Sequence, residues 1–149
     1  MAVFLFIMEK VIAQSLIKAS PEKIWRALTN ADEMRNWYFD IPDFRLKLHH
    51  SFNFYEPGGE NKYHHQCEIL EIIPNAKFQH TWAFPEFSPK KSLVTWELHP
   101  TENGTNVILT HAGLENFADL GDELSVENFK EGWEEIVKQS LKNYVEKSN

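Results

Sequence analysis

The feature that most constrains the fold is a series of strand-like segments with no helical segment between them. In residues 44–55 every second position carries an apolar side chain or a histidine, namely Phe44, Leu46, Leu48, His50, Phe52 and Phe54. Similar patterns recur in residues 63–73, 78–84, 93–98 and 105–111, with short turn-forming segments between them. Parallel strands need crossover connections of a dozen or more residues, so this spacing predicts an antiparallel meander.

Helical patterns flank the strand series. Residues 9–19 are rich in β-branched and apolar side chains and predict a first strand, which runs into a helix start where Ser20 is the cap and Pro21 lies in the first turn. Two short helices are predicted from there to residue 37. Their expected inward side chains are Ile24, Trp25, Leu28, Met34 and Trp37.

A long helix is predicted from the cap residue Ser125 to about residue 146, after a glycine-containing loop over residues 112–124. Its length of about 33 Å would span a small sheet. One arc of this helix is apolar and the opposite arc is charged. The apolar arc consists of Val126, Phe129, Trp133, Ile136, Val137 and Tyr144.

Local motifs, taken in order along residues 9–146, resemble the bacterial single-domain relatives of the activator of heat-shock-protein-90 ATPase, within the START-like or SRPBCC superfamily. These motifs are residues 20–28 (SPEKIWRAL), Trp37, residues 67–72 (CEILEI) with Pro74, Thr81-Trp82, residues 109–114 (LTHAGL) and Gly132-Trp133. The resemblance implies an α+β helix-grip fold: a curved antiparallel β-sheet, two short helices after strand one, and a long C-terminal helix packed across the sheet. The family usually has a glycine pair where this chain has His49-His50, and a glycine at Cys67. Superfamily members bind lipids, hormones and polyketides, and some catalyse reactions, so the fold alone does not fix the function.

Composition excludes several classes of protein. The 149 residues suit one domain, and 22 acidic against 15 basic side chains give a net charge of −7 with no basic cluster, so no nucleic-acid binding is expected. A single cysteine cannot form an internal disulfide, which favours a cytoplasmic location. The apolar run at residues 2–8 is too short for membrane insertion. We expect residues 1–8 to be an extension or lead-in and residues 9–147 to be the domain; a truncated signal peptide is the alternative.

A long helix laid over a curved sheet leaves a gap that is typical of small-molecule sites. We therefore predict a binding module for a small hydrophobic or aromatic ligand, while simple filling of the core is the alternative for each side chain. Ser140 would either face the ligand or bond the carbonyl four residues earlier. The predicted ligand-binding residues are Phe52, Phe54, His80, Trp82, Trp96, Phe129, Trp133 and Ser140.

The seven histidines leave an enzyme open as the second hypothesis. Strand parity points His50, His80, His111 and one of the pair His64 and His65 inward, where a cyclase- or hydrolase-like enzyme would use them as acid or base groups. Their spacing matches no tight metal motif, so no metal site, cofactor or catalytic residue is assigned.

A co-chaperone-like interaction protein is the third hypothesis. Residues 115–135 carry eight carboxylates against one lysine, Lys130, and would dock a basic protein partner. A solvated helix face is the simpler interpretation of the same residues.

Overall fold

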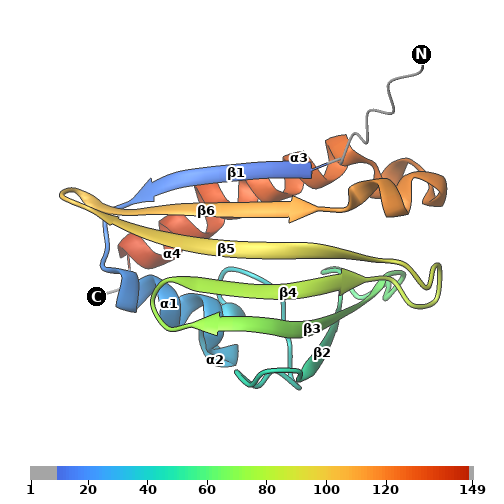
Figure 1. Cartoon of the computed structure of the whole chain (residues 1–149), viewed down its shortest axis with the longest axis horizontal. Helices are drawn as coiled ribbons and strands as arrows, with labels where there is room; N and C mark the ends of the chain where they lie inside the picture. The colour runs from blue at the N-terminus through green and yellow to red at the C-terminus, as the bar shows by residue number, and fades with distance from the viewer. Residues whose placement is uncertain (1–9, 148–149) are drawn as a thin grey trace, which may run out of the picture.

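The computed structural model describes residues 10–147, and its centre is a six-stranded antiparallel sheet (Figure 1). The strands are β1 Lys10–Ile17, β2 Ser51–Tyr55, β3 His64–Ile73, β4 Lys77–Ala83, β5 Lys91–Thr101 and β6 Gly104–Ala112. Their order in the sheet is β1-β6-β5-β4-β3-β2, and every neighbouring pair is antiparallel. The predicted meander is confirmed, and β1 joins it by pairing with β6. The prediction for residues 1–8 lies outside the described residues.

Two short helices follow β1, as predicted. Helix α1, Pro21–Thr29, begins after Ser20, whose Oγ accepts a hydrogen bond from the Lys23 N–H at 3.2 Å. Helix α2, Ala31–Met34, begins after Asn30, whose Oδ1 accepts from the Glu33 N–H at 3.0 Å. The side chains that were expected to point inward from this region are buried.

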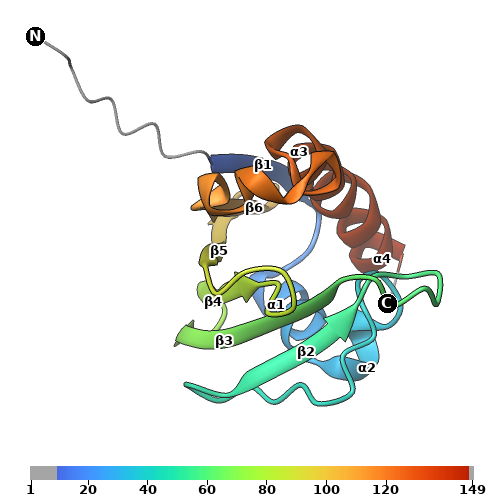
Figure 2. The same ribbon diagram turned by 90° about the vertical axis from the view of Figure 1, so that its right-hand side faces the viewer.

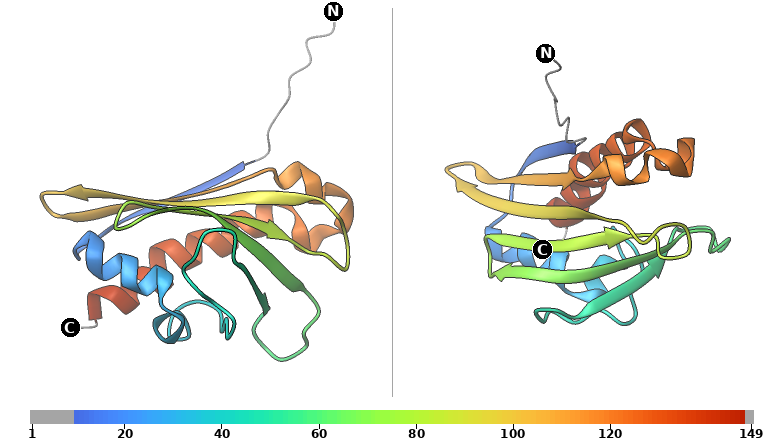
Figure 3. Two further views of the ribbon diagram at one scale, coloured as in Figure 1. Left: turned by 60° about the horizontal axis from the view of Figure 1, so that its bottom comes forward. Right: turned by 45° about the vertical axis from the view of Figure 1, so that its right-hand side comes forward.

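The C-terminal helix runs in three parts along the concave face of the sheet (Figures 2 and 3). They are α3 Val126–Glu135, a wide π-helical segment η3 Ile136–Leu141, and α4 Lys142–Lys147, and Ser125 caps α3 as predicted. The helix-grip arrangement is thereby confirmed. Two 3₁₀ helices, η1 Leu114–Leu120 and η2 Asp122–Leu124, occupy the segment that was predicted as a loop.

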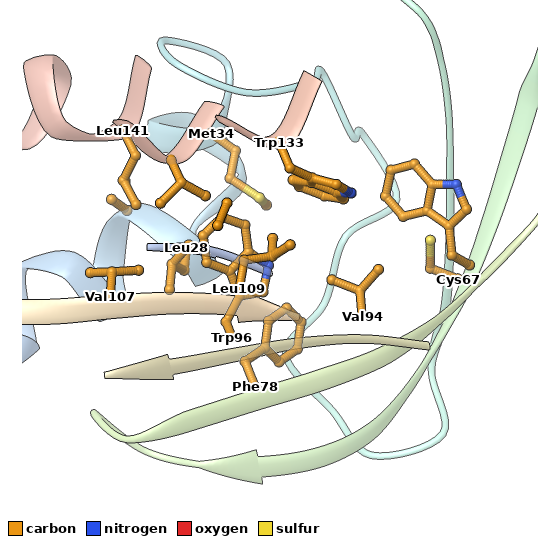
Figure 4. Packing of buried hydrophobic residues seen from close by; sticks show 14 of the residues in the cluster. Leu28, Met34, Cys67, Phe78, Val94, Trp96, Val107, Leu109, Trp133 and Leu141 are labelled. Carbon is orange, nitrogen blue, oxygen red and sulfur yellow. The ribbon is translucent and has the colours of Figure 1, made fainter. Parts of the chain in front are cut away.

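The buried stripe of this helix repeats every fourth residue. It consists of Trp133, Val137, Leu141 and Val145. Four residues of a regular α-helix turn about 40° past a full circle, whereas a π-turn with its longer hydrogen-bonded loop falls short of one. The π-helical segment therefore keeps the stripe on the sheet, and Figure 4 shows Trp133 and Leu141 pointing from the helix into the core.

The strand predicted over residues 44–55 is wrong in its first half, because β2 covers only Ser51–Tyr55. Before it, within the described chain, only the backbones of His49 and His50 hydrogen-bond to β3, both at Ile69. Leu46 and Leu48 are 39% and 49% exposed, and His50 lies half-buried with its Nε2 at 2.7 Å from the Asp43 carbonyl oxygen. His49 has a φ of +68°, the left-handed conformation that favours glycine. This turn breaks the alternation of faces, so the parity of β2 does not extend back through it.

Candidate functional site

A cavity of about 370 Å³ lies between the sheet and the first part of the C-terminal helix. Strands β3 and β4 contribute His65 and Trp82 from the sheet side, while α3 contributes Phe129, Gly132 and Trp133. The remaining lining residues are Phe39, Glu56, Tyr63, Phe84, Glu123, Leu124, Asn128 and Ile136. Most of these side chains are aromatic or aliphatic, which is the usual lining of a small-molecule site.

A chain of hydrogen bonds joins the helix to the sheet behind this cavity. The Trp133 Nε1–H donates to His111 Nδ1 at 2.9 Å, and His111 Nε2 lies 2.7 Å from Ser92 Oγ. An indole is only a donor, so His111 carries its proton on Nε2 and donates it to Ser92, which donates in turn to the Trp82 carbonyl at 3.2 Å. Both ring nitrogens of His111 are thus occupied.

Burial keeps the three inward histidines neutral. It lowers the pKa of His111 to about 3, and it lowers the pKa of His65 and of His80 to about 4. His80 Nδ1–H donates to the Thr81 carbonyl at 2.8 Å, and His65 Nδ1–H donates to the Phe54 carbonyl at 3.3 Å. Within residues 10–147, no three His, Cys, Asp or Glu side chains are grouped so that they could hold a metal ion.

Two buried polar atoms have no hydrogen-bond partner within the described part of the chain. They are Trp82 Nε1 and the Tyr38 hydroxyl. The rings of both residues pack against Phe54 and Trp133, at centroid distances between 5.4 and 6.4 Å. Burial raises the pKa of the Tyr38 hydroxyl, so that group remains a protonated donor.

Charged residues stand at the rim of the cavity. Glu56 accepts hydrogen bonds from the Lys62 and Tyr63 N–H groups, both at 2.8 Å. Lys62 Nζ lies 2.7 Å from Glu123 Oε1 and 5.2 Å from the centre of the Tyr63 ring. This ion pair connects the β2–β3 loop with η2, and the lining itself contains two carboxylates and neither Lys nor Arg.

A second hollow of about 850 Å³ lies beside β2, at the edge of the sheet. Polar and loop residues make up most of its lining, including Asp43, Asn53 and the turn at Pro57 to Gly59. Phe39 and Glu56 line both spaces. The ring of Phe39 stacks on that of Phe54, which lines the larger hollow, at a centroid distance of 4.5 Å.

The structure places the predicted ligand-binding residues in four locations. Trp82, Phe129 and Trp133 line the 370 Å³ cavity together, and Phe54 lines the hollow beside β2. Ser140 donates to the Trp37 carbonyl, which is neither of the two roles expected for it, and lies beside a shallow surface hollow near α4. The buried residues Phe52, His80 and Trp96 lie in the core and line neither of the two larger hollows.

Sequence reasoning missed several lining residues. Phe39 comes from a segment without regular structure, so no periodicity signals it. His65 was one member of an unresolved pair with His64 and is the one that points inward. Gly132 did carry a signal in the sequence. A glycine inside a helix lowers the stability of that helix, so its presence indicates a packing or functional role.

A curved antiparallel sheet that grips a long terminal helix, with a small aromatic cavity between them, defines a helix-grip protein of the SRPBCC type. The chain belongs to the family described as Activator of Hsp90 ATPase homolog 1-like protein, whose profile matches residues 18–146. No curated protein matches the chain. In the described residues, no helix has both the length and the apolar character needed to cross a membrane.

Solved structures show the same architecture. Protein MLL2253 from Mesorhizobium loti is 27% identical with a TM-score of 0.79, and the match covers 94% of this chain and 98% of that one. The Aha1 protein from Colwellia psychrerythraea, solved as a dimer, is 25% identical with a TM-score of 0.73, covering 93% and 96%. Protein CV1439 from Chromobacterium violaceum, at 18% identity and a TM-score of 0.77 over 94% and 99%, shares the fold.

Proposed function

We propose that the protein binds one small, largely apolar ligand in the cavity between α3 and strands β3 and β4. The observation that carries the proposal is the cavity itself, whose volume of about 370 Å³ lies within the usual range of small-molecule sites. Aromatic side chains from the sheet and the helix meet there, so a flat apolar ligand would find ring faces on both sides.

Gly132 supports this proposal because it leaves room over the cavity. A Cβ added there would meet no atom within 4 Å, so close packing does not require glycine. Glycine inside a helix costs about 0.5–1 kcal/mol relative to alanine. Since Gly132 lines the cavity, keeping that space free of a side chain is a reason for which the helix could bear this cost.

The neutral histidines favour binding over acid–base catalysis. Both nitrogens of His111 are engaged within the protein, and at neutral pH none of the three inward histidines carries a proton to give away as an imidazolium. Efficient acid–base groups have pKa values near the working pH, and burial moves these away from it. Cys67 is also buried, and burial raises the pKa of its thiol, so it is a poor nucleophile.

Titration with N-phenyl-1-naphthylamine, a neutral apolar fluorophore, tests the proposal. We expect saturable binding of one molecule per chain. The variant Gly132→Phe should abolish it by filling the cavity, whereas the matched variant Gly132→Ala adds one methyl group and should retain it. Non-saturable fluorescence, or equal binding by both variants, would remove the cavity as the site.

A further inference from the structure

Trp82 stands out among the buried indoles of the core. Trp37 Nε1–H donates to the Ala27 carbonyl at 3.0 Å, and Trp133 Nε1–H donates to His111 at 2.9 Å. Trp82 is only 4% exposed, yet its Nε1–H has no acceptor among residues 10–147. A buried donor without a partner costs about 1–3 kcal/mol, so its presence in a cavity wall calls for an acceptor from elsewhere.

The charges around the cavity restrict what that acceptor is. Glu56 and Glu123 bring negative charge to the rim, and the lining offers no Lys or Arg side chain. The ammonium of Lys62 is already held by Glu123 at 2.7 Å. A carboxylate moved from water into this space would lose its hydration without gaining a counter-ion, which is costly.

We infer that the cavity takes a neutral ligand bearing a hydrogen-bond acceptor, such as a ketone or amide carbonyl, that Trp82 Nε1–H binds, and that it rejects carboxylates. This inference rests on the proposed function and specifies its ligand class. Neighbouring side chains cover the Nε1 atom, while other atoms of the indole line the cavity. The inference therefore requires that the ring turn about its side-chain bonds when the ligand binds, so that the N–H reaches the acceptor.

Three probes with the same naphthalene body isolate the end group. They are 2-acetylnaphthalene with a carbonyl, 2-isopropenylnaphthalene as its planar isostere without an acceptor, and 2-naphthoate as the anion. Each competes with N-phenyl-1-naphthylamine. We expect both neutral probes to bind and 2-naphthoate to bind at least about tenfold more weakly than the ketone, because its charge has no partner in the cavity.

The variant Trp82→Phe removes the donor and keeps a ring. The smaller ring changes its contact with both neutral probes alike, so the hydrogen bond is measured by the difference between them. The ketone should lose between about twofold and about tenfold more affinity than the isostere, the usual range for one hydrogen bond. Trp96→Phe is the matched control, since Trp96 lies in the same core but lines neither of the two larger hollows. It should change neither affinity.

A measurement on the unaltered protein covers the case in which Trp82→Phe fails to fold. The indole ¹⁵N–¹H resonance of Trp82 should move downfield with the ketone and stay in place with the isostere. If that resonance responds equally to both, or if 2-naphthoate binds as tightly as the ketone, the inference is overturned while the proposed function stands. If none of the three probes competes, both fail.

Discussion

The two ends of the helix–sheet interface are built differently. At the C-terminal end, Val137, Leu141 and Val145 are fully buried, and Lys142 Nζ donates to the Leu16 carbonyl at 3.0 Å. The Lys18 N–H donates to Glu146 at 2.9 Å, so that α4 is fastened to the end of β1. At the other end, α3 stands over the 370 Å³ cavity.

The difference lies in the side chains that one helix presents along its length. At the C-terminal end, called the closed end below, compact aliphatic residues at every fourth position are fully buried against the sheet. At the other end, called the open end below, Gly132 contributes no side chain, and Phe129 and Trp133 line the cavity with flat rings. A single helix therefore provides stability at one end and a binding space at the other.

The largest expected effect is at Trp133, which lies where the two ends meet. Trp133→Ala removes a buried ring and leaves His111 Nδ1 without its donor, so it should lower the free energy of unfolding by about 3–5 kcal/mol. Urea denaturation measures this. Trp133→Phe, which keeps a ring and loses only the hydrogen bond, should lose less, and an unchanged midpoint for the alanine variant would contradict the packing described.

The pair Leu141→Ala and Ile136→Ala compares the ends directly. Leu141 is fully buried at the closed end, so its truncation should cost about 2–5 kcal/mol and leave fluorophore affinity unchanged. Ile136 is half-buried beside the cavity, and its truncation should cost about 1 kcal/mol and change fluorophore affinity. If Ile136→Ala lost more stability than Leu141→Ala, the closed end would not be the more tightly packed end of the interface.

The buried histidines predict a loss of stability in mild acid. Their folded pKa values of about 3 to 4 lie below the value of 6.5 for an exposed histidine, so the unfolded chain binds more protons below pH 6.5. Stability is therefore complete above pH 6.5 and falls toward pH 4, by up to about 1.4 kcal/mol per pH unit for each histidine. Urea denaturation from pH 7.5 to 4.8 measures the slope, which His80→Leu should reduce; a flat profile would contradict the burial.

The smallest expected effect is a gain in the stability of the fold. Gly132→Ala should raise the free energy of unfolding by about 0.5–1 kcal/mol, since the added methyl group meets nothing and the helix gains propensity. Gly121→Ala is the contrasting variant, because a φ of +103° strains any other residue, and it should destabilise the protein. Thermal unfolding of both variants gives the sign of each change.

The fold was predictable because local signals agreed with one another. Caps at Ser20 and Ser125 and the alternation along β3 to β6 each specify an element without knowledge of its neighbours. The segment before β2 escaped prediction because the left-handed backbone at His49 is a conformation that hydrophobic parity does not encode.

The candidate site was less predictable than the fold. The alternation along β4 and β5 places both Trp82 and Trp96 on the inward face of the sheet, but of these two only Trp82 lines the cavity. The position of the cavity depends on the sizes of the surrounding side chains, which the alternation does not reveal. Phe39 reaches the site through tertiary packing of an irregular segment. Ligand binding by Trp82, Phe129 and Trp133 stays a prediction.

The wide turn at Ile136–Leu141 also allows the helix to contain an extra residue without changing the direction in which the side chains after it face. A π-turn is equivalent to one residue inserted into an α-helix, so deleting a single residue such as Lys138 would restore regular winding. Val145 would then follow Trp133 by eleven residues, which is within about 20° of three full turns of an α-helix, so it would still face the sheet. The full sequence wound as a regular α-helix would instead turn Val145 about 120° away from the sheet and break the ties of α4 to β1. The π-turn therefore fixes the register in which the closed end meets the open one.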